Sequence, residues 1–169
     1  MFDILKEFKF EKVPRKIAYF DKEPLNLSNE LTFFHNKNKF RKYLTQLQYL
    51  IKSYTNTPLQ AAGIRDSYLN EEFSEKFLIV LLSTSETIKK TNEIIEPHSD
   101  MELNNGCFYL EVDTNFMLLL SRDMEGLILG VNTMEIILKQ IMEDYMNQKQ
   151  FDDYIKICSF ELIDCIKSV

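Results

Sequence analysis

The stretch that decides the fold is NGCFYLEVDTNFMLLLSRDMEGLILGVNTMEIILKQI, residues 105–141. Apolar and polar residues alternate through 107–112, the triplet DTN predicts a turn, and FMLLL at 116–120 is typical of a buried strand. Asp123 is a natural helix N-cap, because its carboxylate can accept from the first free N–H groups of the following helix. The stretch therefore predicts a β-hairpin followed by a long helix.

This helix contains two of the four glycines in the chain, Gly126 and Gly130. Each glycine costs a helix about 0.5–1 kcal/mol relative to alanine, so we expect a compensating contact. A core-facing apolar stripe runs beside them at spacings of four and three: Leu127, Val131, Met134, Leu138 and Ile141. Together with Thr133, the glycines form a strip of small residues that another backbone can approach closely. Gly126, Gly130 and Thr133 are therefore predicted to serve helix–sheet packing.

Upstream segments add strands and a second helix. Residues 13–28, VPRKIAYFDKEPLNLS, predict a strand pair around a DKEP turn. A helix is expected from Asn36 or Asn38 to Tyr54, because its apolar residues step by three and four. LQAAGI and the continuous apolar run KFLIVLLS both have strand length.

Three segments complete the chain. Residues 1–12 are amphipathic and predict a helix or an arm, and 85–95 predict a short helix. The tail 142–169 contains a run that fits either a strand or a helix. We expect one domain over 1–169 with an α/β (α+β) fold: a mixed sheet of about five to seven strands, with two main helices packed on one face.

Composition limits the function. A net charge of −6 and a pI of about 5.0 argue against general binding of nucleic acid, whose phosphates attract lysine and arginine. The basic stretch at 36–43 is interpreted as a solvated helix face rather than a nucleic-acid patch. No run is long and apolar enough for a signal peptide or a membrane span. We expect a cytoplasmic location with no membrane partner, and leave a secreted parent protein open.

The three cysteines, Cys107, Cys158 and Cys165, form an odd and sparse set. Such a set is more typical of buried reduced thiols than of a disulfide framework. The sequence predicts that all three thiols are free.

Candidates for chemistry are weak. The neighbouring acids Asp152–Asp153 and Glu71–Glu72 are expected on the surface, and proximity of His35 or His98 to a cysteine cannot be read from the sequence. The spacings needed for zinc or for a phosphate-binding loop are missing. We therefore predict no catalytic residue, no metal site and no cofactor.

The order of these elements resembles a known family. VPRKIAYFDKEPLNL, the hairpin, and the spacing of Gly126, Gly130 and Thr133 as G-x-x-x-G-x-x-T are similar to the non-catalytic N-terminal domain of family 20 glycoside hydrolases, the β-N-acetylhexosaminidases. The resemblance covers roughly 13–141, which it implies is the core, with 142–169 as a tail leading toward a catalytic barrel absent from this chain. Met134 and Ile136 depart from the family's usual leucine and glutamine.

The resemblance implies an accessory role. The chain would be a non-catalytic scaffold domain of a β-N-acetylhexosaminidase-like glycosidase, with the catalytic barrel of the same polypeptide, or another protein chain, as its partner. The alternative is a stand-alone protein-interaction module. A small carbohydrate-binding domain is a third reading, although the chain has no tryptophan for stacking on sugars.

Overall fold

The computed structural model describes residues 5–27, 32–35, 38–55, 60–63, 78–83, 103–147 and 155–166. The predicted short helix at 85–95, the acids Glu71, Glu72, Asp152 and Asp153, and His98 lie outside these residues.

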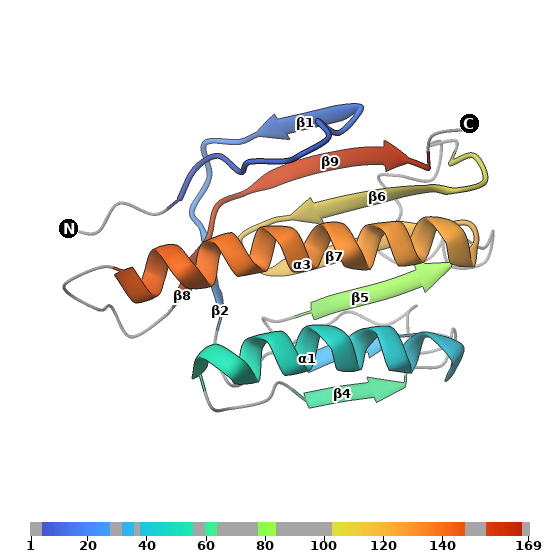
Figure 1. The fold of residues 1–169 in the computed structure, drawn as a ribbon, viewed down its shortest axis with the longest axis horizontal. Coiled ribbons are helices and arrows are strands. Elements are labelled where there is room, and N and C mark those ends of the chain that lie inside the picture. The colour runs from blue at the N-terminus through green and yellow to red at the C-terminus, as the bar shows by residue number, and fades with distance from the viewer. Residues whose placement is uncertain are drawn as a thin grey trace.

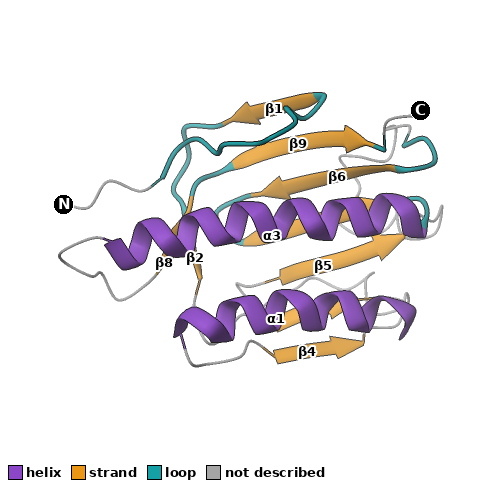
Figure 2. Cartoon of the chain, in the orientation of Figure 1, coloured by secondary structure: helices purple, strands orange, loops and turns teal. Residues whose placement is uncertain are grey.

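Along the described chain, groups of strands are separated by the helices α1 and α3 (Figure 2). The strands are β1 (Lys16–Tyr19), β2 (Leu25–Leu27), β3 (Thr32–His35), β4 (Gln60–Gly63), β5 (Leu78–Ser83), β6 (Cys107–Val112), β7 (Phe116–Ser121), β8 (Ile155–Ile157) and β9 (Phe160–Cys165). The helices are the 3-10 turn η1 (Asn38–Phe40), α1 (Arg41–Thr55) and α3 (Met124–Asn147).

Seven of these strands form one mixed sheet in the order β1-β9-β6-β7-β5-β3-β4. The strands β4, β3, β5 and β7 pair with one another in parallel, whereas the pairs β7–β6, β6–β9 and β9–β1 are antiparallel. Strands β2 and β8 form a separate antiparallel pair. The helices α1 and α3 run side by side across one face of the main sheet (Figure 1). The predicted mixed sheet with two main helices on one face is confirmed.

The hairpin of β6 and β7 is also confirmed. The strands pair antiparallel from Phe108–Ser121 to Val112–Met117, and the Asp113 N–H donates to the Phe116 carbonyl at 2.9 Å. Alternate β6 residues Phe108, Leu110 and Val112 are buried in the core beneath the helices. The alternation read from the sequence therefore sets which side chains face α3.

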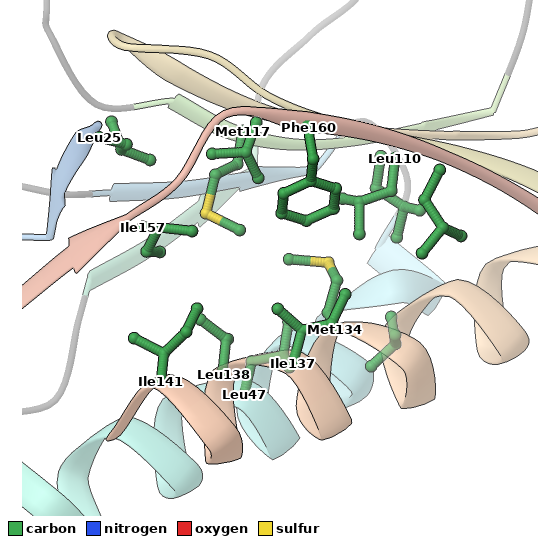
Figure 3. Close-up of a cluster of buried hydrophobic side chains, with 14 of the residues drawn as sticks. Leu25, Leu47, Leu110, Met117, Met134, Ile137, Leu138, Ile141, Ile157 and Phe160 are labelled. Atoms are coloured by element: carbon green, nitrogen blue, oxygen red, sulfur yellow. The ribbon is translucent and has the colours of Figure 1, made fainter. Parts of the chain in front are cut away.

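The core lies between this sheet and the helices (Figure 3). Met134, Ile137, Leu138 and Ile141 of α3 point toward strand residues, and Leu47 joins them from α1. The strand side chains that they face include Leu25, Leu110, Met117, Ile157 and Phe160. The apolar stripes predicted for both helices are buried here, and burial of each large side chain contributes about 1.5–3 kcal/mol.

Two pairings differ from the prediction. The strands β1 and β2 both form, but they do not pair with each other, because β1 pairs with β9 and β2 pairs with β8. Both partners come from the tail at 142–169. Because β9 lies between β1 and β6, residues 160–165 belong to the sheet core rather than to a segment that leads away from it.

The cysteine prediction is wrong for two of the three residues. Cys107 and Cys165 are disulfide-bonded, while Cys158 is free and buried. The cause is register: β6 and β9 pair antiparallel with Cys107 directly opposite Cys165, although 58 positions separate them in sequence. Disulfides persist mainly in oxidising compartments, so this bond does not support the expected cytoplasmic location.

Within the described segments, no helix is both long and apolar enough to cross a membrane. Lys39 of η1 and Arg41 and Lys42 at the start of α1 are exposed, and the interpretation of the basic stretch as a solvated helix face stays a prediction.

Candidate functional site

The start of α3 is fixed by hydrogen bonds that join it to the end of β7 and to the turn before β6. Asp123 caps the helix as predicted: its Oδ1 accepts from the Gly126 N–H at 2.8 Å. Its Oδ2 accepts from the Gly106 N–H, also at 2.8 Å, in the turn before β6. The buried Ser121 hydroxyl donates to the Asp123 carbonyl at 2.6 Å. One carboxylate therefore ties the helix to the sheet, in addition to satisfying a free N–H group.

The turn at Gly106 requires glycine. Its φ is +76°, which is in the left-handed region that residues with a Cβ rarely adopt. Its carbonyl accepts from the Ile166 N–H at 2.8 Å, directly after the Cys107–Cys165 disulfide. The end of β9 is thus held against the start of β6 by a covalent bond and a hydrogen bond.

Gly126 lies directly against the backbone of β6. A Cβ atom at this position would be 2.8 Å from the Cys107 carbonyl carbon and 2.6 Å from the Ser121 Oγ. Real Cβ atoms essentially never approach so closely, so the backbones of α3 and β6 would have to separate. The absent side chain is what permits the helix to begin this close to the sheet.

Gly130 and Thr133 continue the strip one turn and two turns later. A Cβ at Gly130 would lie 2.6 Å from the Leu119 Cδ1 and 3.1 Å from the Phe108 ring. Thr133 is buried, and its hydroxyl donates to the Leu129 carbonyl at 2.8 Å. The two glycines therefore contact the sheet, whereas Thr133 lies at the side of α3, where it lines a cavity.

This cavity lies beneath the N-terminal arm, which we define as residues 5–15. It measures about 650 Å³. Its walls are formed by the arm, α3 and the end of β9: Lys9, Phe10, Glu11, Lys12, Pro14, Leu129, Thr133, Ile136, Asp164, Cys165 and Ile166. The sequence left a helix or an arm open for 1–12, and the described residues 5–12 form no helix or strand.

The arm is held near its middle and at its last residue. The Gln140 side-chain amide accepts from the Lys9 N–H and donates to the Lys9 carbonyl, both at 2.8 Å. Phe8 packs edge-on against Phe160 with ring centroids 5.2 Å apart. At the last residue of the arm, the Arg15 N–H donates to Asp164 Oδ1 at 3.4 Å.

The opposite face of the sheet carries a polar cluster. The Tyr109 hydroxyl donates to Glu161 at 3.2 Å, and Lys16 lies 3.4 Å from the same carboxylate. Glu111 lies opposite Glu161 in the strand register. Burial of Tyr109, followed by the nearby charges of Glu111 and Glu161, raises the pKa of its phenol well above the usual value. Tyr109 therefore acts as a hydrogen-bond donor to a carboxylate that also pairs with Lys16.

Other candidates do not assemble with the polar cluster. His35 is buried in β3, at the far side of the main sheet from β9. The free Cys158 is buried, and burial raises the pKa of its thiol to about 11, so it is a poor nucleophile near neutral pH. In the described ranges, no three His, Cys, Asp or Glu side chains come together as metal ligands.

The sequence did not indicate the disulfide, the role of Ser121 or the cavity. Cys107 lies two residues before Tyr109 on the same face of β6, which was the available signal for the direction of its side chain, but its partner strand could not be chosen. The cap at Asp123 and the glycine contacts of α3 define the class of the domain: a mixed α+β domain in which α3 lies directly on the sheet.

Solved structures share this fold. CpGH84D matches over 94% of this chain with a TM-score of 0.62 and 12% identity. The N-acetyl-β-hexosaminidase of Streptomyces plicatus and the GH20 β-N-acetylhexosaminidase of Streptomyces coelicolor A3(2) each match over 89% with TM-scores of 0.57, at 11% and 10% identity. The resemblance to family 20 glycoside hydrolases is thereby confirmed at the level of the fold.

The shared fold is only part of those proteins. This chain spans 24% of the CpGH84D chain and 25% of each of the two Streptomyces chains. No protein-family model matches the sequence, and no curated protein does.

Proposed function

We propose that this chain is a non-catalytic accessory domain of a glycoside hydrolase. The observation that carries the proposal is coverage: about nine-tenths of this chain matches about a quarter of each hexosaminidase chain. A unit of this size in a longer hydrolase leaves the remaining three-quarters for other domains. The parent reaction proposed is hydrolysis of terminal N-acetylhexosamine residues.

The geometry supports a scaffold role. Gly126 and Gly130 lie against β6 and β7, and a packing role for these two residues supports the scaffold proposal. Asp123 is engaged by two backbone N–H groups. The domain would contribute stability and orientation to a catalytic barrel in the same polypeptide, with a barrel in another chain as the second arrangement.

The partner would cover apolar side chains that this chain leaves in water. Val13 is 76% exposed, Tyr49 67% and Met146 51%. Single exposed apolar residues are common, but contact with a large domain would remove such area from water at about 25 cal/mol per Å².

The test asks which part of the polypeptide carries the hydrolase activity. The purified chain is assayed with a chromogenic N-acetyl-β-glucosaminide, next to a longer protein expressed from the coding sequence that contains it. We expect turnover only from the longer protein. Turnover by the chain alone would contradict the non-catalytic role, and a coding sequence without a hydrolase domain would favour the stand-alone interaction module.

A further inference from the structure

The N-terminal arm that covers the cavity is held in place by hydrogen bonds to α3 and β9. Gln140 holds the Lys9 main chain through two hydrogen bonds, and Asp164 accepts from the Arg15 N–H. Because the arm is fixed at Lys9 and at Arg15, the span between these two residues is held over α3 and β9. Sites for small molecules are usually preformed in this way, and their volumes fall at roughly 300–1,000 Å³. The cavity, at about 650 Å³, lies within that range.

The walls of the cavity are mainly apolar. Phe10 and Pro14 contribute from the arm, Leu129 and Ile136 from α3, and Ile166 from the residue after β9. Ile136 and Ile166 are each 47% exposed, although the core elsewhere buries such side chains almost completely. An apolar body in the cavity would remove both isoleucines from water, and this gain would drive binding.

The polar side chains around the cavity are balanced in charge. Lys9 and Lys12 supply two ammonium groups, while Glu11 and Asp164 supply two carboxylates. An ion of either sign would therefore meet repulsion as well as attraction. A hydroxyl group both donates and accepts, so it can bond to the ammonium groups and to the carboxylates.

We propose that this cavity binds an uncharged amphipathic molecule with an alkyl or aryl body and a hydroxylated head. The apolar body lies against Leu129, Ile136 and Ile166, and the head lies among the charged groups of the arm and Asp164. This binding activity goes beyond the scaffold role and does not depend on it, since it needs only the described chain.

The probe for the experiment is n-octyl β-D-glucoside, used below the concentration at which it forms micelles. Calorimetric titration of the full chain measures affinity, and amide chemical shifts locate the site. Octanoate, octylammonium and free glucose serve as comparison ligands. The variant Ile136→Asp places a carboxylate in the apolar wall. Met146→Asp is the matched control, because Met146 is 51% exposed on the same helix and does not line the cavity.

The expected result is saturable binding of the glucoside, with shifts at Leu129, Thr133 and Ile166. Ile136→Asp should weaken this binding roughly tenfold or more, because a charge replaces apolar surface, whereas Met146→Asp should leave it unchanged. Both charged octyl compounds should bind more weakly than the glucoside, and free glucose should show no saturation.

Four outcomes would overturn the proposal. The first is no binding below the micelle threshold, and the second is equal loss of binding in the two variants. The third is binding of octanoate or octylammonium as tightly as the glucoside. The fourth is concentration-dependent self-association that Ile136→Asp abolishes without any glucoside binding, which would assign the surface to a protein partner.

Discussion

Replacement of Gly126 by alanine separates two opposing effects. Alanine is favoured over glycine in a helix interior by about 1 kcal/mol, so an unobstructed site would gain stability. In this structure the new Cβ would lie 2.8 Å from the Cys107 carbonyl carbon and 2.6 Å from the Ser121 Oγ. Overpacking against groups that cannot move costs roughly 1–3 kcal/mol, and here one neighbour is backbone. We expect Gly126→Ala to lower the free energy of unfolding by up to about 2 kcal/mol.

Gly130→Ala provides a graded comparison. Its Cβ would meet the terminal methyl group of Leu119 at 2.6 Å, and a side-chain end shifts more easily than backbone. The gain in helix propensity should offset most of this cost, which leaves a change within about 1 kcal/mol. Lys139→Ala, at an exposed position of α3, controls for propensity alone and should stay within about 0.5 kcal/mol.

Urea unfolding followed by circular dichroism measures all three variants. The order of stability expected is wild type and Lys139→Ala highest, then Gly130→Ala, then Gly126→Ala. A Gly126→Ala protein more stable than wild type by about the propensity difference would refute close contact between α3 and β6.

Reduction of the Cys107–Cys165 disulfide should lower the free energy of unfolding by up to about 4 kcal/mol, which is the chain-entropy value for its 58-residue separation. Urea unfolding with and without a phosphine reductant measures this change, and equal unfolding curves would contradict it. The raised pKa of Tyr109 stabilises the fold fully below the unfolded tyrosine pKa of about 10, and this stabilisation is lost as pH rises above that value. Tyr109→Phe should therefore make the alkaline fall in stability shallower, and an unchanged slope would be inconsistent with the burial. Cys158, with a thiol pKa of about 11, should react with an aromatic disulfide reagent near neutral pH only after unfolding, so immediate labelling of the native protein would argue against its burial. Gln140→Ala should cost about 1 kcal/mol and speed amide exchange in the arm, while unaltered exchange would show that its two hydrogen bonds do not hold the arm.

Local signals made much of the fold predictable. The hairpin and α3 depend on alternation, a turn and the Asp123 cap, which all act within neighbouring residues. Gly126 and Gly130 were recognisable because two glycines in an otherwise strong helix require a reason. These features are encoded by residue spacing, and the structure forms them where the spacing indicates.

Long-range pairing was not predictable in the same way. The partner of β1 is β9, almost a full chain length away, and nothing in either short strand selects the other. The Cys107–Cys165 bond depends on that same placement of β9 beside β6. The cavity likewise exists only because the arm crosses from Phe8 to the end of β9, which requires the finished sheet.

The most direct test of the packing between α3 and the sheet is a nuclear Overhauser measurement on the isotopically labelled chain. Contacts are expected between the Gly126 α-protons and the Ser121 β-protons, and between the Gly130 α-protons and the ring protons of Phe108. Their absence, together with rapid solvent exchange of the Gly126 and Gly130 amides, would contradict a helix that lies directly on the sheet.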